Sequence, residues 1–236
     1  MTAIHNSSPR NAELSLPSTI HQALKKIWLA MMGIRPTACV SLASPNPGDQ
    51  AWMISPERLP KEPLVYSLGL SENLSFDLGM IQKFGAKVYG FDPTIESQRF
   101  IAKSDLPAGF HYHPLAVAGH DGQLELYERR GKGGRKKGGC FLKASCKKIS
   151  TLVQELGHRR LDILKIDVEG SEYPILEDVC LKGIPVSQIA VEFHHRFEEV
   201  GLAATLRAHQ MLLKNGYQLA HISDWAEEFL YIKREE

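Results

Sequence analysis

The sequence lacks the features of a secreted or membrane-spanning protein. It has only 4 cysteines in 236 residues, none in CxxC spacing, and a chain of this size does not need disulfides to stabilise its core. The N-terminus is polar, and the apolar stretch 27–34 is too short and too late for a secretion signal or a membrane span. We therefore expect reduced thiols, no membrane association and a cytoplasmic location.

The sequence also lacks an excess of charge of either sign. Lys and Arg total 28 and Asp and Glu total 27, so the net charge predicts neither a polyanionic partner nor a membrane surface. Apolar residues make up 43% of the chain, which is enough for a substantial core. This composition is typical of an ordinary globular protein with one main domain.

The first 63 residues differ from the rest, and we predict an N-terminal extension over 1–63 and a main domain over 64–236. Within 19–33, apolar side chains recur at helical spacing, at Ile20, Leu24, Ile27 and Met31. We interpret this segment as an amphipathic helix that packs on the main domain. Six prolines between residues 36 and 63 disfavour long regular elements in the remainder of the extension.

From residue 64 onward, short apolar strands alternate with helical patterns. Strands are predicted at 64–69, 86–91, 161–167 and 188–193, followed by a terminal strand pair in YQLAHIS and EFLYIK. This alternation predicts an α/β fold with a doubly wound, mostly parallel sheet. Residues 129–139 contain five glycines and six positive charges without an acid, which predicts a mobile basic loop between strands.

Ligands of such sheets bind outside the carboxyl ends of the strands. Gly69 permits a tight turn after the first strand, and Ser71 or Asn73 can cap the next helix, whose N–H groups suit an anion. Asp92 directly follows the second strand, 23 positions after Gly69, where a carboxylate can accept the hydroxyl groups of an adenosine ribose. The alternative is that Asp92 only caps the helix that begins near Thr94.

Acidic and histidine side chains follow the next two strands. We expect Asp167 and Glu169 to face the ligand crevice and to hold a polar substrate or a cation. Strand alternation places Glu192 and His194 on one face and His195 on the other. A histidine beside a carboxylate suits proton removal near neutral pH, so His194 is the first candidate base and His195 the second. The alternative is a structural histidine at a strand end.

A metal site is another interpretation of this region. His111 and His113 form an HxH pair, to which Asp167, Glu169 and the later histidines would add ligands. Because nothing has the ligand spacing of a zinc site, we predict no metal.

Six segments together resemble the FkbM-type S-adenosylmethionine-dependent methyltransferases, from about residue 64 to the C-terminus. They are VYSLGLSENLSF, VYGFDPT, HYHPLAVAGHDGQLELY, ISTLVQEL, LDILKIDVEGSEYPIL and IAVEFHH, of which KIDVEGSE is the most specific. The resemblance implies a Rossmann-like sheet with an antiparallel last strand, S-adenosylmethionine as cofactor, and O-methylation of a hydroxyl on a small molecule such as a sugar or natural product.

The resemblance also implies roles for individual residues. The first turn would lie near the methionine part of the cofactor, Asp92 at the ribose, and Leu115 with Ala116 near the adenine. Asp167 and Glu169 would orient the acceptor hydroxyls or the cationic end of the cofactor. The residues of the first turn that would bind the cofactor are Ser67, Gly69, Ser71, Glu72 and Asn73.

Two other functions stay open at this point. An NAD-dependent oxidoreductase shares the glycine turn and the acidic second strand tip, although the sequence lacks a fuller GxGxxG. A non-catalytic nucleic-acid-binding module would use 129–137 with Lys143, Lys147 and Lys148, but few aromatics interleave these residues. We interpret the basic segment instead as a lid that favours an acceptor bearing phosphate or carboxylate.

Overall fold

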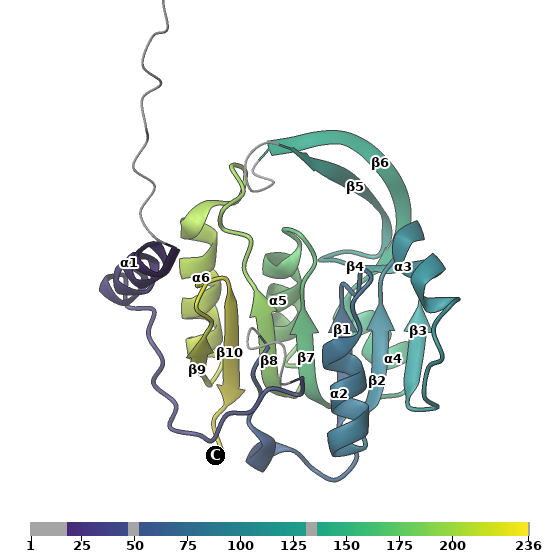
Figure 1. Cartoon of the computed structure of the whole chain (residues 1–236), viewed down its shortest axis with the longest axis horizontal. Coiled ribbons are helices and arrows are strands. Elements are labelled where there is room, and N and C mark those ends of the chain that lie inside the picture. Colours follow the sequence, from purple (N-terminus) through teal and green to yellow (C-terminus); the bar gives the residue numbers. More distant parts are fainter. Residues whose placement is uncertain (1–17, 47–51, 131–135, 236) are drawn as a thin grey trace, which may run out of the picture.

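The structure is a computed structural model, which describes residues 18–46, 52–130 and 136–235. Its centre is a seven-stranded sheet with the order β3-β2-β1-β7-β8-β10-β9 (Figure 1). The strands are β1 (Leu64–Leu68), β2 (Lys87–Phe91), β3 (Phe110–His113), β7 (Leu161–Ile166), β8 (Val186–Glu192), β9 (Tyr217–Ile222) and β10 (Glu228–Lys233). Neighbouring strands are parallel except where β10 pairs with β8 and β9. The predicted Rossmann-like α/β sheet with an antiparallel last strand is confirmed.

Helices cover both faces of this sheet (Figure 1). They are α2 (Ser75–Phe84), α3 (Ile95–Ile101), α4 (Ile149–Glu155), α5 (Glu172–Leu181) and α6 (Gly201–Lys214). The helices α4, α5 and α6 lie side by side and enclose the larger apolar cluster. The second cluster combines α2 and α3 with Trp52 and Ile54 of the N-terminal segment. This double covering explains why the central strands are apolar on both faces.

The proline-rich segment packs on the sheet in an extended form. The backbone N–H groups of Thr37 and Ala38 donate to the carbonyl of Leu219 in β9, and Ala43 pairs with Ile54 in an isolated antiparallel bridge. The short 3-10 helix η1 (Pro56–Arg58) follows. In the described part of this segment, no regular element is longer than η1, as its prolines predict.

The helix α1 (Ser18–Met31) agrees with the predicted span, but the side opposite to its apolar stripe faces the main domain. Leu29 is buried against the domain, and Lys25 and Lys26 form ion pairs with Glu227 and Asp224 in the β9–β10 turn. The predicted apolar stripe is exposed, at Ile20, Leu24, Ile27 and Met31. The helix packs on the main domain as predicted, but it does so through Leu29 and the two lysine ion pairs, on the side opposite to the apolar stripe.

A second sheet of three strands stands over the carboxyl ends of the main sheet. It contains β4 (Ala116–Val117), β5 (Gly122–Arg130) and β6 (Lys136–Lys147), and the β5–β6 hairpin arches over the molecule (Figure 1). The prediction of a loop over 129–139 was wrong at both ends of this range, which belong to β5 and β6. Arg129 pairs with Lys137, and Arg130 pairs with Lys136. Residues 131–135 lie outside the described residues.

Two further expectations concern the chain as a whole. All four cysteines are free thiols, as predicted. Of the helices in the described ranges, none has the length and apolar character needed to cross a bilayer.

Candidate functional site

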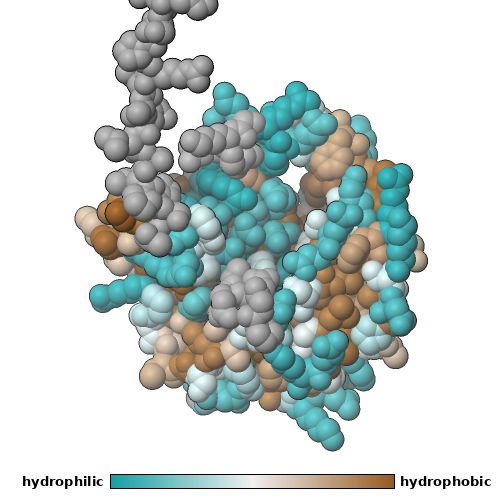
Figure 2. All heavy atoms as spheres, viewed as in Figure 1, coloured by the Kyte–Doolittle hydropathy of each residue, from teal (hydrophilic) through white to brown (hydrophobic). Residues whose placement is uncertain are grey.

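A cavity of about 990 Å³ lies between the tips of β1, β2 and β7 and the underside of the β5–β6 hairpin. The space-filling view is hollowed at this place, with hydrophilic side chains around the opening (Figure 2). The strand tips contribute Gly69, Asp92, Asp167 and Glu169 to its wall. Its volume stands near the upper end of small-molecule sites, so it has room for a large cofactor with a second ligand.

Gly69 ends β1 in a tight turn that lets two strand tips approach closely. Its φ is +78°, and a Cβ at this position would lie 1.7 Å from the backbone oxygen of Asp167. The N–H of Gly69 donates to the carbonyl of Phe91 at 3.0 Å, and the N–H of Asp167 donates to that of Leu68 at 2.9 Å. Only glycine fits here, and the turn therefore sets the tips of β2, β1 and β7 in one row.

Asp92 lies at the tip of β2, and its carboxylate is fully engaged within the protein. Oδ2 accepts the N–H groups of Leu70 and Ser71, both at 2.9 Å. Oδ1 accepts the N–H of Thr94 at 2.8 Å and its hydroxyl at 2.6 Å. A carboxylate offers about four lone-pair sites, so these bonds fill all of them. The structure shows Asp92 bracing Thr94, the N-cap of α3, and the ribose contact stays a prediction.

The other residues predicted to hold the cofactor divide into two groups. Ala116 lines the cavity, whereas Leu115 does not. Ser67 is fully buried beneath the turn, close to Asp77, so the structure gives it no surface for a direct cofactor contact. The exposed turn residues outside the lining are Ser71, Glu72 and Asn73.

Sequence reasoning missed several residues of the cavity wall. Glu96 lies one helical turn after Asp92, and Tyr127 and Phe141 come from the hairpin above. The signal for Glu96 was its place in the first turn of α3, next to a strand tip already singled out. The hairpin residues carried no such signal, because only the folded chain brings β5 and β6 over the strand tips.

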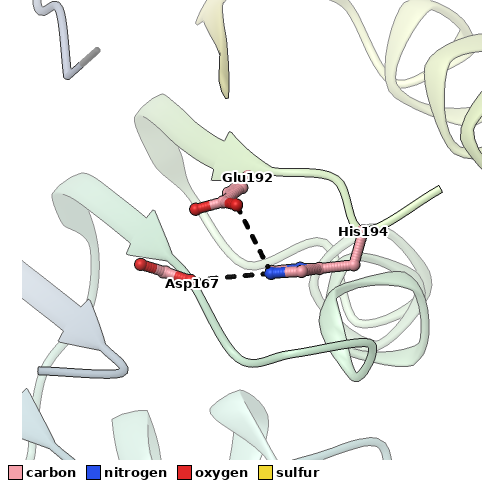
Figure 3. Close-up of side chains that lie close together, drawn as sticks. All are labelled: Asp167, Glu192 and His194. Atoms are coloured by element: carbon pink, nitrogen blue, oxygen red, sulfur yellow. Dashed lines mark ion pairs between the residues drawn. The ribbon is translucent and has the colours of Figure 1, made fainter. Parts of the chain in front are cut away.

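His194 lies among carboxylates at the tips of β7 and β8 (Figure 3). We call Asp167, Glu169, Glu192 and His194 the acidic cluster. The Nε2 atom of His194 is 3.4 Å from Glu192 Oε1, 3.6 Å from Glu169 Oε2 and 3.9 Å from Asp167 Oδ1. The ring is fully buried, and neither nitrogen makes a hydrogen bond with any described residue. The predicted placement of Glu192 and His194 on one face is confirmed.

Glu172, the first residue of α5, holds His194 in place. Its Oε1 accepts the backbone N–H of His194 at 2.7 Å, and its Oε2 accepts the N–H of Gly170 at 2.8 Å. The same Oε1 lies 3.4 Å from His194 Nδ1. Glu172 is fully buried, and it is the last residue of KIDVEGSE, which is the one signal that would have found it.

The electrostatics of the acidic cluster disagree with a histidine base. Burial lowers the pKa of His194, but the carboxylates of Glu172, Glu169 and Glu192 outweigh it and leave the pKa raised. Burial and the charge of Asp167 raise the pKa of Glu192. A raised pKa favours the protonated ring at neutral pH, and a protonated ring has no lone pair for another proton. His194 also lies outside the cavity lining, so the structure does not support it as the base.

The second candidate base, His195, is no better placed. Burial lowers its pKa to about 4, and its charged neighbours include Glu227, Lys25 and Arg196, with His194 beside it in the chain. It does not line the cavity. The structure therefore places neither histidine where it would meet a substrate directly.

The HxH pair lies on β3, apart from the acidic cluster. The rings of His111 and His113 stack on Tyr89, with centroid distances of 4.7 Å and 5.9 Å. In the described ranges, the residues with the geometry to share a metal ion are Asp167, Glu192 and His194. The HxH pair is therefore not part of that group.

Arg129, near the end of β5, ties the hairpin to the tip of β7. Its Nη1 forms an ion pair with Glu199, its Nη2 donates to the carbonyl of Glu169 at 3.0 Å, and its guanidinium lies 3.7 Å from the ring centroid of Phe197. On the facing strand, Lys137 lines the cavity with its Nζ 3.5 Å from the ring centroid of Tyr127. The hairpin is thus a roof that is fastened on the acidic side of the cavity.

Comparison with known proteins identifies relatives of the chain. A family model described as "Methyltransferase FkbM domain" matches residues 75–219. "Probable methyltransferase-like protein 24" of Homo sapiens and that of Rattus norvegicus are each 26% identical to the chain over 137 residues. The match covers 57% of this chain and 33% of each relative, so the chain spans about a third of the length of these relatives.

Solved structures that resemble the chain include two archaeal proteins. Fibrillarin of Aeropyrum pernix, in complex with S-adenosyl-L-methionine, has a TM-score of 0.45 and 9% identity, with 75% of this chain and 68% of that chain covered. The fibrillarin pre-rRNA processing protein of Methanococcus jannaschii has a TM-score of 0.47 and 9% identity, with 90% and 76% covered.

Proposed function

The chain belongs to the FkbM methyltransferase family, and from this premise we propose that it methylates a hydroxyl oxygen of a small molecule. Its cofactor is S-adenosylmethionine, which the family uses. The observation that supports the proposal is that one cavity joins the tips of β1 and β2 to the acidic tip of β7. A methyl donor and an acceptor must meet in one space, and this cavity has the volume for both.

The residues around the first two strand tips fit S-adenosylmethionine. The Gly69 turn leaves backbone open to the cavity, and Ala116 with Val117 offers an apolar wall for an adenine ring. Asp92 and Glu96 supply carboxylates for ribose hydroxyls. The rotatable hydroxyl of Thr94 is the partner of Asp92 that would yield first to a ribose hydroxyl.

The acidic tip of β7 supplies the groups for the acceptor. When bound, the cofactor supplies a sulfonium methyl, to which the acceptor oxygen forms a C–O bond while the S–C bond breaks and its electron pair returns to sulfur. Asp167 lines the cavity and accepts the hydrogen bond of the acceptor hydroxyl, which orients its oxygen. Glu169, whose side chain is 59% exposed, takes the hydroxyl proton and releases it to water.

The charge of the roof favours an acceptor that carries a phosphate or carboxylate. Lys137 lines the cavity from the hairpin, and it is the lysine among the described lining residues. Attraction to an anionic group there would concentrate the acceptor under the hairpin. The attraction of an anionic acceptor by the basic segment therefore rests on Lys137, a residue that the structure describes.

A nucleic-acid partner gains no support from the basic residues of the hairpin. Of the basic residues that the structure describes here, most are paired with nearby carboxylates, as Lys143 is with Glu125 and Lys147 with Glu155. Arg130 likewise pairs with Glu128. Nucleic-acid binding depends on Lys and Arg side chains that neutralise phosphates and release counterions. Side chains already paired with carboxylates contribute less to this attraction. Family membership likewise favours a transferase over an NAD-dependent oxidoreductase.

The proposal is tested by product analysis with the full chain. Labelled S-adenosylmethionine and panels of sugars and polyketide-type alcohols should give S-adenosylhomocysteine together with an O-methyl product. Matched panels in which an amine replaces the hydroxyl are the control. Methylation of the amines alone would contradict the oxygen acceptor, and a melting temperature that rises with NAD but not with S-adenosylhomocysteine would contradict the cofactor site.

A further inference from the structure

The ring of His194 is a buried polar group without a hydrogen bond in the described structure. It is 0% exposed, and both of its nitrogens lack a hydrogen bond in the described structure. Leaving such a group unpaired costs about 1–3 kcal/mol, so an unpaired group that persists needs an explanation. Its Nε2 points at the carboxylates of Asp167 and Glu192 (Figure 3), 3.9 Å and 3.4 Å away, and neither contact has the geometry of a hydrogen bond.

These separations match those of atoms that share one metal ion. Nitrogen and oxygen ligands lie about 2.0–2.2 Å from an ion such as Zn²⁺, so two ligand atoms of one ion are roughly 3–4 Å apart. His194 Nε2 lies 3.4 Å from Glu192 Oε1 and 3.9 Å from Asp167 Oδ1, and all three ligand atoms fall within 4.8 Å of one another. The gap between the three side chains therefore has the size of a cation.

The surroundings of His194 resemble those of a metal-binding histidine. Such a histidine commonly directs its other ring N–H to a carboxylate, which fixes the orientation of the ring. The Nδ1 atom of His194 lies 3.4 Å from Glu172 Oε1, and this buried carboxylate also accepts the backbone N–H of His194. The ring is thus held from behind while Nε2 faces the cavity side.

The charge of the group also favours a divalent cation. Four carboxylates surround the ring, namely Asp167, Glu169, Glu172 and Glu192. Two cations reach them, since Arg196 Nη1 is 3.2 Å from Glu192 and Lys165 Nζ is 3.9 Å from Asp167. A bound cation would displace the proton that the carboxylates favour on the ring, so that the ring is neutral in the metal-bound state. Four carboxylates and two cations then leave two negative charges, which one divalent cation would balance.

We propose that Asp167, Glu192 and His194 bind one divalent transition-metal cation of the Mn²⁺ or Zn²⁺ type. An imidazole with two carboxylates suits these ions, whereas Mg²⁺ and Ca²⁺ prefer oxygen ligands alone. This proposal departs from the expectation of no metal, which rested on sequence spacing. Asp167 and Glu192 stand at the ends of neighbouring strands, and ligands from separate strands leave no short motif in a sequence.

The chemical role of the cation rests on the proposed function. Asp167 lies at the boundary between the metal group and the cavity, so a cation beside it would meet the oxygen of an acceptor hydroxyl. A cation bound to that oxygen eases loss of the hydroxyl proton, which then passes to Glu169. The freed electron pair on oxygen forms the C–O bond in the transfer described above.

Metal binding is tested on the full chain without cofactor or acceptor. After dialysis against EDTA and its removal, Mn²⁺ is titrated and followed by electron paramagnetic resonance, and Zn²⁺ and Mg²⁺ by calorimetry. We expect one equivalent of Mn²⁺ to bind and to raise the melting temperature, and Mg²⁺ to bind at least tenfold more weakly. Glu192→Gln and His194→Gln should each weaken Mn²⁺ binding by tenfold or more.

Glu227→Gln is the matched control, because Glu227 also pairs with Arg196, at 2.7 Å, but lies outside the metal group. It should bind Mn²⁺ as the wild type does. Absence of Mn²⁺ and Zn²⁺ binding, or equal binding by Glu192→Gln and wild type, would overturn the site. Equal affinity for Mg²⁺ would overturn the role of the imidazole. If His194→Gln does not fold, Glu192→Gln decides the question.

The metal result and the proposed function can fail separately. A chain that binds Mn²⁺ but methylates no hydroxyl would leave the metal site standing and reject the proposed function. Undiminished methyl transfer in EDTA would keep the proposed function and overturn the role of the cation.

Discussion

At the tip of β2, the carboxylate of Asp92 accepts four hydrogen bonds from within the protein, whereas the buried ring of His194, beyond the tip of β8, accepts or donates none in the described structure. Both groups stand at the carboxyl edge of one sheet. The first is braced by its own chain, and the second is surrounded by charge that its own chain does not neutralise. Asp92 thus has its hydrogen bonds within the chain, whereas the ring of His194 has none, and the proposed cation would supply its partner.

The two regions can also be compared in their backbone conformation. On the first side, Gly69 alone permits the close approach of β1 and β7. On the second side, Glu169 has a φ of +53°, a left-handed conformation that is costly for a residue with a side chain. Ser71, in the turn after β1, has a φ of +51° and adopts the same conformation, so strained backbone is present in both regions.

The largest effect is expected from Gly69→Ala, which breaks the contact between the two regions. The new Cβ would clash with the backbone of Asp167, so the free energy of unfolding should fall by roughly 4 kcal/mol or more. Gly157→Ala is the control, because Gly157 has a φ of +70° with nothing within 4 Å, and should cost only about 1–2 kcal/mol. Equal losses in urea unfolding would mean that the close approach contributes nothing.

Asp167→Asn sharpens the comparison from the acidic side. Turnover with a hydroxyl acceptor should fall by ~10²-fold or more, because the amide neither orients the hydroxyl nor carries charge as the carboxylate does. Affinity for S-adenosylhomocysteine, measured by calorimetry, should stay within about tenfold. Parallel losses of binding and rate would show that Asp167 is structural and that the two regions do not divide the work.

Asp92→Asn tests the braced side. We expect S-adenosylhomocysteine to bind more weakly by ~1.5–3 kcal/mol, because a charged acceptor for ribose hydroxyls is lost. Thr94→Val is the companion variant, since it removes the hydroxyl that occupies Asp92 Oδ1 while leaving the carboxylate charged. It should bind the cofactor product at least as well as wild type. Unchanged calorimetric affinity in Asp92→Asn would reject the ribose contact.

The smallest effect is expected in the roof. Lys137→Ser should raise the KM for an anionic acceptor by a few-fold and flatten its salt dependence, because an exposed charge of this kind contributes up to about 1 kcal/mol. Lys136→Ser is the control, since Lys136 is exposed and does not line the cavity. Identical kinetics of the two variants at low salt would remove Lys137 from acceptor binding. Arg135, which also belongs to the basic segment, lies outside the described residues.

Much of the fold was predictable because it is written in local patterns. Alternating apolar strands and helices predicted the parallel sheet, and the polar residues that follow each strand predicted which side chains gather at its carboxyl edge. Gly69, Asp92 and Asp167 were found in this way. Such signals depend only on neighbouring residues, so the sequence by itself determined the strands, their tips and the candidate ligand edge.

The tertiary structure decided what those patterns do not record. The side chain of Glu172 lies behind His194, Asp167 and Glu192 meet across two strands, and the β5–β6 hairpin covers the strand tips. The orientation of α1, which leaves its apolar stripe exposed, also depends on ion pairs to the distant β9–β10 turn. Charge, burial and hydrogen-bond satisfaction depend on distances between residues far apart in the chain, and local periodicity carries no information about those distances.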